Sequence, residues 1–218
     1  MSREQTIFID LDDTLYAQDN GVWQAISSQI QNYLIQRLGL DPKTAEQVRA
    51  DYLAQYGTTL NGLRVNYHID PHDYLQFVHQ IPLEKMLKPD PHLREILEAT
   101  PHRKIIFTNS SRDHAQRVLT CLGVSDQFEI IIDIFSLDFV NKPDPAAYAK
   151  ALTLSGDPDP RLCTMFDDRL PNLIPAGQIG FTTVLVGGDS DMDGADYQVP
   201  SIHALPEVLK RIERDKKR

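Results

Sequence analysis

The sequence predicts an α/β protein with a Rossmann-like, three-layer parallel sheet core and an inserted all-helical domain. From about residue 91 onward, short apolar runs alternate with amphipathic segments, the pattern of parallel strands joined by helical crossovers. Between residues 17 and 87, helical patterns follow one another with no strand-like run. Such a stretch is too long for a connecting loop, so we expect a separate helical domain there.

The helices of this inserted domain have clear start and stop signals. The first ends before Gly39 and repeats apolar residues every four positions, at Val22, Ile26, Ile30 and Leu34. The pairs Asp41-Pro42 and Asp70-Pro71 each place a capping carboxylate before a proline at the first helical position, so two more helices are expected to begin there. A short helix is expected over residues 60–67.

The α/β core opens with a strand at residues 6–9, whose residues all favour burial inside a parallel sheet. Its further strands are expected over 104–110, with polar residues at the carboxyl end, and over 130–132, 162–166 and 182–186. Its helices are expected over 93–97, 112–122, 144–153, 170–179 and roughly 204–214. We therefore assign residues 1–16 and 88–218 to the core, and residues 17–87 to the helical domain.

Charge and composition exclude several classes of partner. The 218-residue chain has a formal net charge of −9, so we expect no nucleic acid partner. It begins without an apolar secretory segment and has no run long enough to cross a bilayer, which predicts no membrane association and a cytoplasmic location. Cys121 and Cys163 show no metal-ligand spacing and are expected to be free thiols. We expect a monomer or a homodimer.

Polar side chains stand at the carboxyl ends of three predicted strands. They are Asp10 and Asp12 after the first strand, Thr108 and Asn109 after the second, and Asp167 and Asp168 after the fourth. Because parallel strands end at one edge of a sheet, these groups are expected to converge; the alternative is three independent polar loops. Converging carboxylates require a cation, and an all-oxygen ligand set suits Mg²⁺. Lys142 can neutralise an anionic oxygen, so phosphate is the expected ligand.

These residues resemble the motifs of the haloacid dehalogenase (HAD) superfamily of phosphohydrolases. The matching stretches are residues 10–14, Thr108-Asn109, Lys142 and Asp167-Asp168, in the order and spacing of that superfamily. The inserted helical domain is similar to the smaller cap of the superfamily. A closer resemblance, to pyrimidine 5′-nucleotidases, rests on residues 56–63, 87–90, 107–109 and 166–169.

The resemblance implies a phosphomonoester hydrolase that works through an aspartyl-phosphate intermediate. Asp10 would attack phosphorus, and Asp12 would protonate the leaving oxygen and then activate water, so that one acid serves both steps. Thr108 and Lys142 would hold the phosphoryl oxygens. Such catalysis depends mostly on positioning and charge neutralisation.

The resemblance also implies the metal ligands. Mg²⁺ would be held by Asp10, the backbone carbonyl of Asp12, and Asp168, with Asp167 close by or bound through water. Residues 13 and 14 are expected mostly to fix the turn that leaves the strand.

A small phosphorylated metabolite is the expected substrate, and the nucleotidase resemblance favours a nucleoside monophosphate. Substrate contacts are expected from Asn109 and from four cap residues near the glycines at 57 and 62, namely Tyr56, Asn61, Arg64 and Tyr67. The cap is expected to close over the substrate and exclude water, as lids commonly do.

Other functions remain open at this point. Within enzymes they are a sugar-phosphate or phosphoglycolate phosphatase and a phosphomutase; a carbon–halogen hydrolase is disfavoured because its leaving group does not need the acid Asp12. A receiver-like signalling module would carry its phosphoacceptor on the third strand, where Asp133 is the single candidate, and would leave residues 17–87 unexplained. An inactive member that only binds is a further alternative.

Two stretches imitate functional motifs. Residues 88–91 repeat the Lys-Pro-Asp-Pro of residues 142–145, but Lys142 alone lies between the second and fourth motifs, so we assign it the phosphate role and treat Lys88 as a hinge residue. Residues 189–194 imitate the start of a calcium loop, but Pro200 stands where that loop needs glutamate, which favours a solvated acidic loop.

Overall fold

The computed structural model describes residues 5–187 and 194–217, and the acidic stretch 189–193 lies outside them. The chain divides into two compact units. One contains Met1–Ala17 and Leu87–Arg218, and the other contains Gln18–Met86. Both cysteines, Cys121 and Cys163, are free thiols.

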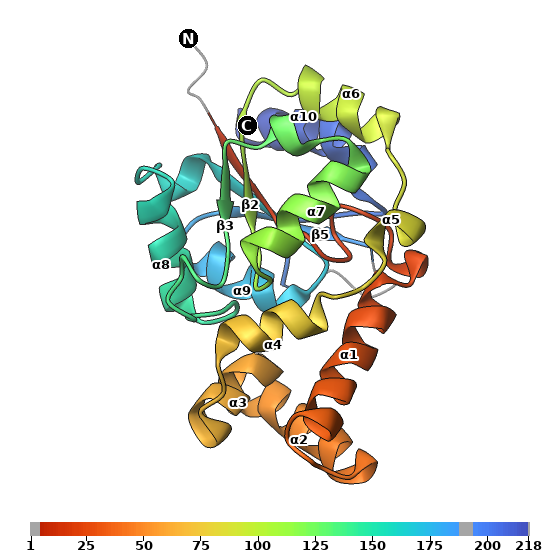
Figure 1. Cartoon of the computed structure of the whole chain (residues 1–218). Coiled ribbons are helices and arrows are strands. Elements are labelled where there is room, and N and C mark those ends of the chain that lie inside the picture. The colour runs from red at the N-terminus through yellow and green to blue at the C-terminus, as the bar shows by residue number, and fades with distance from the viewer. Residues whose placement is uncertain (1–4, 188–193, 218) are drawn as a thin grey trace. The chain divides into compact units, whose positions relative to one another are not determined.

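The larger unit is built on a six-stranded parallel sheet with the order β3-β2-β1-β4-β5-β6 (Figure 1). The strands are β1 (Thr6–Ile9), β2 (Arg103–Phe107), β3 (Ile130–Ile132), β4 (Cys163–Asp167), β5 (Thr182–Val186) and β6 (Tyr197–Val199). The predicted α/β class is thus confirmed. From β1 the chain adds β2 and β3 on one side of the sheet, and it then crosses to the other side of β1 to form β4. The strand order therefore reverses between β1 and β4, and open α/β sheets bind ligands at such a point.

The edge strand β6 was not predicted. It is three residues long, and Tyr197 and Gln198 are only partly buried. A strand this short at the edge of a sheet has one neighbour and needs no continuous apolar run, so it carries little pattern.

Helices cover the sheet on both faces. They are α6 (Pro91–Ala99), α7 (Arg112–Leu122), α8 (Pro145–Leu154), α9 (Leu170–Gln178) and α10 (Leu205–Asp215). On one face, Phe8, Phe107 and Met165 pack in a single buried cluster with Tyr148 of α8 and Leu173 of α9. Helix α7 lies over the opposite side of β2 and β3 (Figure 1). Burial on both faces explains why the central strands read as continuous apolar runs.

The smaller unit is entirely helical within the described residues. Its α-helices are α1 (Val22–Gln36), α2 (Pro42–Tyr56), α3 (Thr59–Tyr67), α4 (Pro71–Val78) and α5 (Leu83–Met86). The predicted caps form: Asp41 accepts hydrogen bonds from the backbone N–H groups of Lys43 and Thr44, and Asp70 accepts one from His72. The single-turn helix α5 was not predicted, because four residues cannot show a helical period.

Gly62 allows α3 to pack closely on α2. A β-carbon at this position would lie 2.2 Å from Cγ and 2.5 Å from Cβ of Tyr52. Rotating the tyrosine ring cannot relieve a clash with its own Cβ, so the two helices would have to move apart. We expect Gly62→Ala to lower the free energy of unfolding by about 1–3 kcal/mol, as overpacking does.

Chemical denaturation of Gly62→Ala measures this effect, and Gly177→Ala is the matched control. A β-carbon at Gly177 would lie 3.6 Å from Thr183, an ordinary contact, within helix α9. We expect the control to be as stable as the parent or more stable, because alanine favours helix. Equal stability of Gly62→Ala and the parent would contradict the predicted clash.

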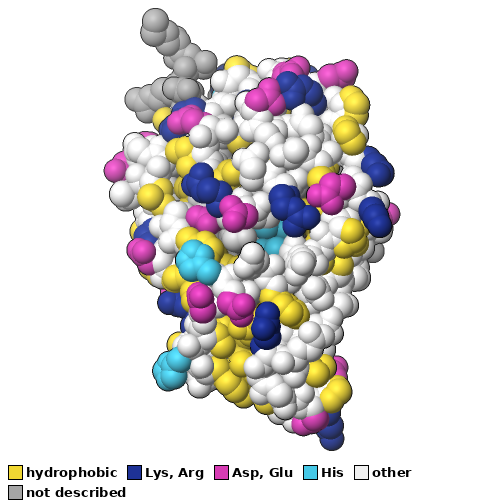
Figure 2. All heavy atoms as spheres, in the orientation of Figure 1, with side chains coloured by type: hydrophobic (Ala, Val, Ile, Leu, Met, Phe, Trp, Pro, Cys, Tyr) yellow, Lys and Arg dark blue, Asp and Glu magenta, His cyan; other side chains and the backbone are white. Residues whose placement is uncertain are grey.

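None of the helices in the described ranges combines the length and the apolar character that a bilayer crossing requires. On the face drawn in Figure 2, basic and acidic side chains are interspersed.

Candidate active site

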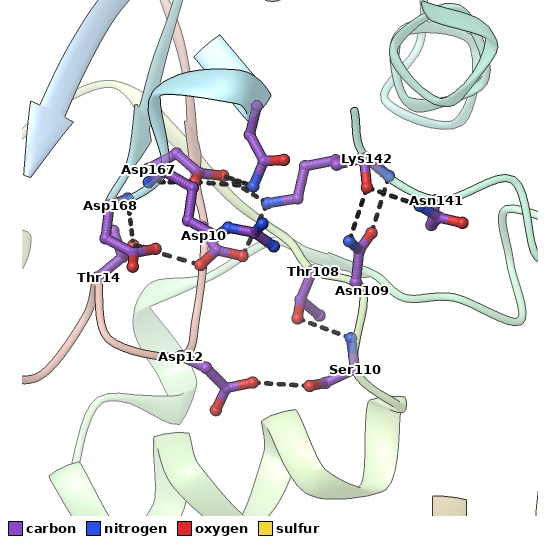
Figure 3. Close-up of polar contacts among 12 residues, drawn as sticks. Asp10, Asp12, Thr14, Thr108, Asn109, Ser110, Asn141, Lys142, Asp167 and Asp168 are labelled. Carbon is purple, nitrogen blue, oxygen red and sulfur yellow. Dashed lines mark hydrogen bonds and ion pairs between the residues drawn. The ribbon is translucent and has the colours of Figure 1, made fainter. Parts of the chain in front are cut away.

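The polar residues predicted at the strand ends lie along one edge of the sheet. Asp10 follows β1, Asp167 is the last residue of β4 and Asp168 follows it, and Thr108 follows β2. The backbone N–H of Asp10 donates to the carbonyl of Phe166 at 2.9 Å, which ties the end of β1 to the end of β4. Figure 3 shows these side chains gathered at this edge.

Three carboxylates form a compact acidic cluster. One oxygen each from Asp10, Asp167 and Asp168 lies within 4.8 Å of the others, an arrangement that could hold a metal ion. Burial, together with the charge of Asp167, raises the pKa of Asp168 to about 6. Burial likewise raises the pKa of Asp10, with Lys142 acting in the opposite direction. Both shifts express mainly the cost of burying a charged carboxylate, to which the charges of the neighbouring acids add.

Lys142 joins two of the three acids. Its side chain is 1% exposed, and its Nζ lies 2.7 Å from Oδ1 of Asp10 and 2.7 Å from Oδ2 of Asp167. Burial lowers the pKa of Lys142, but the negative charges of Asp10 and Asp167 raise it by more. The lysine pKa therefore lies above its usual value. One ammonium against three carboxylates leaves the cluster with excess negative charge, which a cation would balance.

Asn109 holds the backbone that carries Lys142. Its Oδ1 accepts from the backbone N–H of Lys142 at 2.9 Å, and its Nδ2 donates to the carbonyl of Lys142 at 3.0 Å. Both ends of this amide are therefore engaged by the neighbouring chain (Figure 3). Thr108 is buried, and its Oγ1 accepts from the backbone N–H of Ser110 at 3.0 Å.

Thr14 does more than fix a turn. Its Oγ1 lies 3.2 Å from Oδ2 of Asp10 and 3.2 Å from Oδ1 of Asp168, and it accepts from the backbone N–H of Asp168 at 3.0 Å. It therefore links β1 to the loop after β4. Asp13 has a left-handed backbone (φ 62°), which aspartate tolerates better than most residues, as expected for a turn.

The side chain of Asp12 lies apart from the acidic cluster. Its Oδ1 is 2.6 Å from the Tyr16 hydroxyl and 2.8 Å from Nε2 of His114, and its Oδ2 is 2.6 Å from the Ser110 hydroxyl. Burial raises the pKa of Asp12, but His114, Ser110 and Tyr16 more than offset it and hold the pKa below its usual value.

The sequence led us to expect Asp12 to converge with the other acids at the strand ends, but β1 ends at Ile9 and the described acidic cluster contains Asp10, Asp167 and Asp168. Sequence reasoning also missed Tyr16, Ser110 and His114 as partners of Asp12. The available signal was a histidine in the first turn of a helix that follows a polar strand end.

The four predicted cap residues lie in or beside α3 in the smaller unit. Nη1 of Arg64 donates to Oδ1 of Asn61 at 2.9 Å, one turn away on the same helix. The Tyr56 hydroxyl accepts from Asn66 at 3.1 Å, and Tyr67 is 39% exposed. Their contact with substrate remains a prediction.

The fold and the site together define a parallel α/β protein that gathers a buried lysine and clustered carboxylates at the carboxyl edge of its sheet. The chain belongs to the haloacid dehalogenase-like hydrolases, whose family model matches residues 4–180. The resemblance of the motifs to the haloacid dehalogenase superfamily is thereby confirmed, whereas the closer resemblance to pyrimidine 5′-nucleotidases stays a prediction.

A yeast protein is similar to most of this chain. The chain is 31% identical over 197 residues to Phosphate metabolism protein 8 of Saccharomyces cerevisiae, a match covering 83% of this chain and 61% of the yeast protein. It therefore spans less than two thirds of that relative's length.

Solved structures share the fold. β-Phosphoglucomutase of Clostridium difficile aligns with a TM-score of 0.66 and 18% identity over 99% of this chain and 100% of that one. A HAD phosphatase from Thermococcus onnurineus aligns with a TM-score of 0.62 and 21% identity over 94% and 97%.

Proposed function

We propose that the protein is a Mg²⁺-dependent phosphomonoester hydrolase that acts through an aspartyl-phosphate on Asp10. The observation that carries this proposal is the position of Asp10, which belongs to the acidic cluster and also contacts the buried Lys142 at 2.7 Å. A carboxylate beside both a cation site and an ammonium can approach a phosphate dianion without prohibitive repulsion.

Asp10 is better placed than Asp167 to act as the nucleophile. Its side chain is 12% exposed, whereas that of Asp167 is 0% exposed. Asp167 is also committed to other partners, because it accepts from Lys142, from Nδ2 of Asn172 and from the backbone N–H of Arg169. Asp10 thus retains access to a substrate, while Asp167 mainly anchors the lysine.

The donor set fits Mg²⁺. The ligands would be Asp10, Asp168 and the backbone carbonyl of Asp12, with Asp167 adjacent, and these are hard oxygen donors of the kind Mg²⁺ prefers. When bound, the ion would neutralise charge on the phosphoryl group. Lys142 and Thr108 would hold phosphoryl oxygens from the other side.

Asp12 is the proposed acid and base. In the first step, an oxygen of Asp10 bonds to phosphorus while the bond to the leaving oxygen breaks, and Asp12 gives that oxygen its proton. In the second step, Asp12 takes a proton from water as the water oxygen attacks phosphorus, which releases phosphate and restores both acids.

The proposed substrate is a nucleoside monophosphate, with the helical unit acting as a cap that selects it. This rests on the resemblance of residues 56–63 and 87–90 to pyrimidine 5′-nucleotidases. Arg64 and Asn61, already paired on α3, are suited to recognise a polar base or sugar. A sugar-phosphate phosphatase and a phosphomutase are the alternatives within the same chemistry.

A phosphate-release screen with and without Mg²⁺ tests the proposal. We expect faster release from nucleoside 5′-monophosphates than from sugar phosphates, loss of release in excess chelator, and recovery when Mg²⁺ is restored. Asp168→Asn should raise the Mg²⁺ concentration needed for half-maximal activity by about tenfold, because a charged ligand is lost.

Asp126→Asn is the matched control for that variant. Asp126 pairs with Arg94 at 2.7 Å on the surface, and its side chain is 61% exposed. We expect its Mg²⁺ requirement to match that of the parent. Full phosphate release in excess chelator would overturn the metal-dependent mechanism, and preference for sugar phosphates would overturn the substrate assignment alone.

A further inference from the structure

Asp12 lies in a cradle of three polar side chains, which we call the Asp12 cradle: Tyr16, Ser110 and His114. They come from two stretches of the chain: Tyr16 is 4 positions from Asp12, whereas Ser110 and His114 are 98 and 102 positions away. His114 lies in the first turn of α7, where its backbone N–H donates to Ser111, and its side chain is 0% exposed. The hydrogen bond to Asp12 satisfies one nitrogen of this buried imidazole, as buried polar groups require.

The direction of each contact follows from the charge of Asp12. An ionised carboxylate can only accept hydrogen bonds, so Nε2 of His114 and the Tyr16 hydroxyl both donate to Oδ1. Two donors occupy most of the accepting capacity of that oxygen. Oδ2 receives the Ser110 hydroxyl and keeps one accepting position.

The two oxygens of Asp12 also point in different directions. Figure 3 shows one directed toward Ser110 and the other pointing away from Asp10. The oxygen bonded to Ser110 is Oδ2. The Ser110 hydroxyl can donate to an ionised Oδ2 and accept from a protonated one, so this contact survives a change in protonation.

We infer that His114 is a positioning residue for acid–base catalysis: by occupying Oδ1 of Asp12 together with Tyr16, it makes Oδ2 the oxygen that carries the transferred proton. In the first step the proton leaves Oδ2 for the leaving-group oxygen as its bond to phosphorus breaks. In the second step Oδ2 takes a proton from the attacking water. This inference rests on the proposed phosphomonoesterase function and on Asp12 as its acid.

Leaving groups of different basicity test the inference. 4-Nitrophenyl phosphate releases a stable anion and needs little protonation, whereas phenyl phosphate releases a more basic oxygen and depends on an acid. The ratio of kcat/KM for the two compounds isolates the first step, because kcat/KM does not report the later hydrolysis of the phosphoenzyme. A purely structural role of His114 would lower both values equally.

We expect His114→Leu to lower kcat/KM for phenyl phosphate at least about tenfold more than for 4-nitrophenyl phosphate. This is less than the rate enhancement that a general acid usually contributes, because Asp12 itself is still present. His114→Gln keeps an N–H donor and should restore most of the ratio. Ser110→Ala removes the contact to Oδ2 and should shift the ratio in the same direction as His114→Leu, which keeps the test available if the leucine variant does not fold.

A second histidine–aspartate pair supplies the control. Nε2 of His203 lies 2.9 Å from Oδ2 of Asp90, the cap of α6, outside the residues assigned to the site. His203→Leu should leave the ratio unchanged. Equal losses on both compounds in His114→Leu and Ser110→Ala would overturn the positioning role.

Asp12→Asn distinguishes the positioning role of His114 from the acid role of Asp12. If this variant shifts the ratio and His114→Leu does not, the inference about His114 alone fails. If Asp12→Asn leaves the ratio unchanged, the acid role of Asp12 fails, and the inference fails with it. If the parent enzyme releases phosphate neither from these compounds nor from nucleoside or sugar phosphates in the presence of Mg²⁺, the proposed function itself is overturned.

Discussion

Asp10→Asn should reduce phosphate release by about 10,000-fold or more, because an amide cannot form the covalent intermediate and losses of this size follow removal of a nucleophile. The fold should survive, since Lys142 retains Asp167 as a partner at 2.7 Å. Neutralising Asp10 also relieves repulsion with Asp167 and Asp168. Steady-state phosphate release and thermal unfolding of the same preparation measure both effects.

Asp133→Asn is the matched control for Asp10→Asn. Asp133 is also buried and also follows a strand of the sheet, but its carboxylate accepts from the backbone N–H groups of Arg112 and Ser136. We expect this variant to lose stability and to keep its chemistry. Loss of phosphorylation in Asp133→Asn together with an active Asp10→Asn would instead support the receiver-like alternative.

Lys142→Ala should damage both activity and stability. Its removal leaves Asp10 and Asp167 buried without their shared cation, and breaking a buried ion pair in this way costs about 3–5 kcal/mol. It also removes the ammonium proposed to hold a phosphoryl oxygen, so we expect about a 1,000-fold loss of phosphate release. Denaturant unfolding and initial rates at saturating Mg²⁺ measure the two losses.

Lys88→Ala tests the choice between the two Lys-Pro-Asp-Pro stretches. Lys88 is exposed, whereas Lys142 is buried against the acidic cluster. We expect the Lys88 variant to stay within about 0.5 kcal/mol of the parent in stability, as surface changes usually do, and to keep its activity. Reversed severities of the two variants would show that the phosphate role belongs to Lys88.

Local patterns account for much of the fold. The strands at 130–132 and 182–186 and the helix at 112–122 have the predicted bounds. Apolar runs buried on both faces, together with the serine cap and the glycine stop of α7, are signals carried by neighbouring residues. The helix starts at Pro42 and Pro71 were predictable for the same reason.

The grouping of the acids was only partly predictable. Asp10, Asp167 and Asp168 converge because parallel strands end at one edge, a consequence of the fold class. The position of the Asp12 side chain depends on contacts with Ser110 and His114, about a hundred positions away, which no local pattern encodes. The same holds for Asn109, whose amide holds the backbone of Lys142.

By itself the sequence determined the α/β class, the helical insertion and the acids at the strand ends, because strand periodicity, helix caps and chain order are local or topological properties. Tertiary structure decided which acids share a cluster and which one stands apart. Strand β1 ends at Ile9, so the regular alternation of side chains stops before Asp12, and the chain then turns through the left-handed Asp13. Packing against α7, rather than strand geometry, then sets the direction of the Asp12 carboxylate.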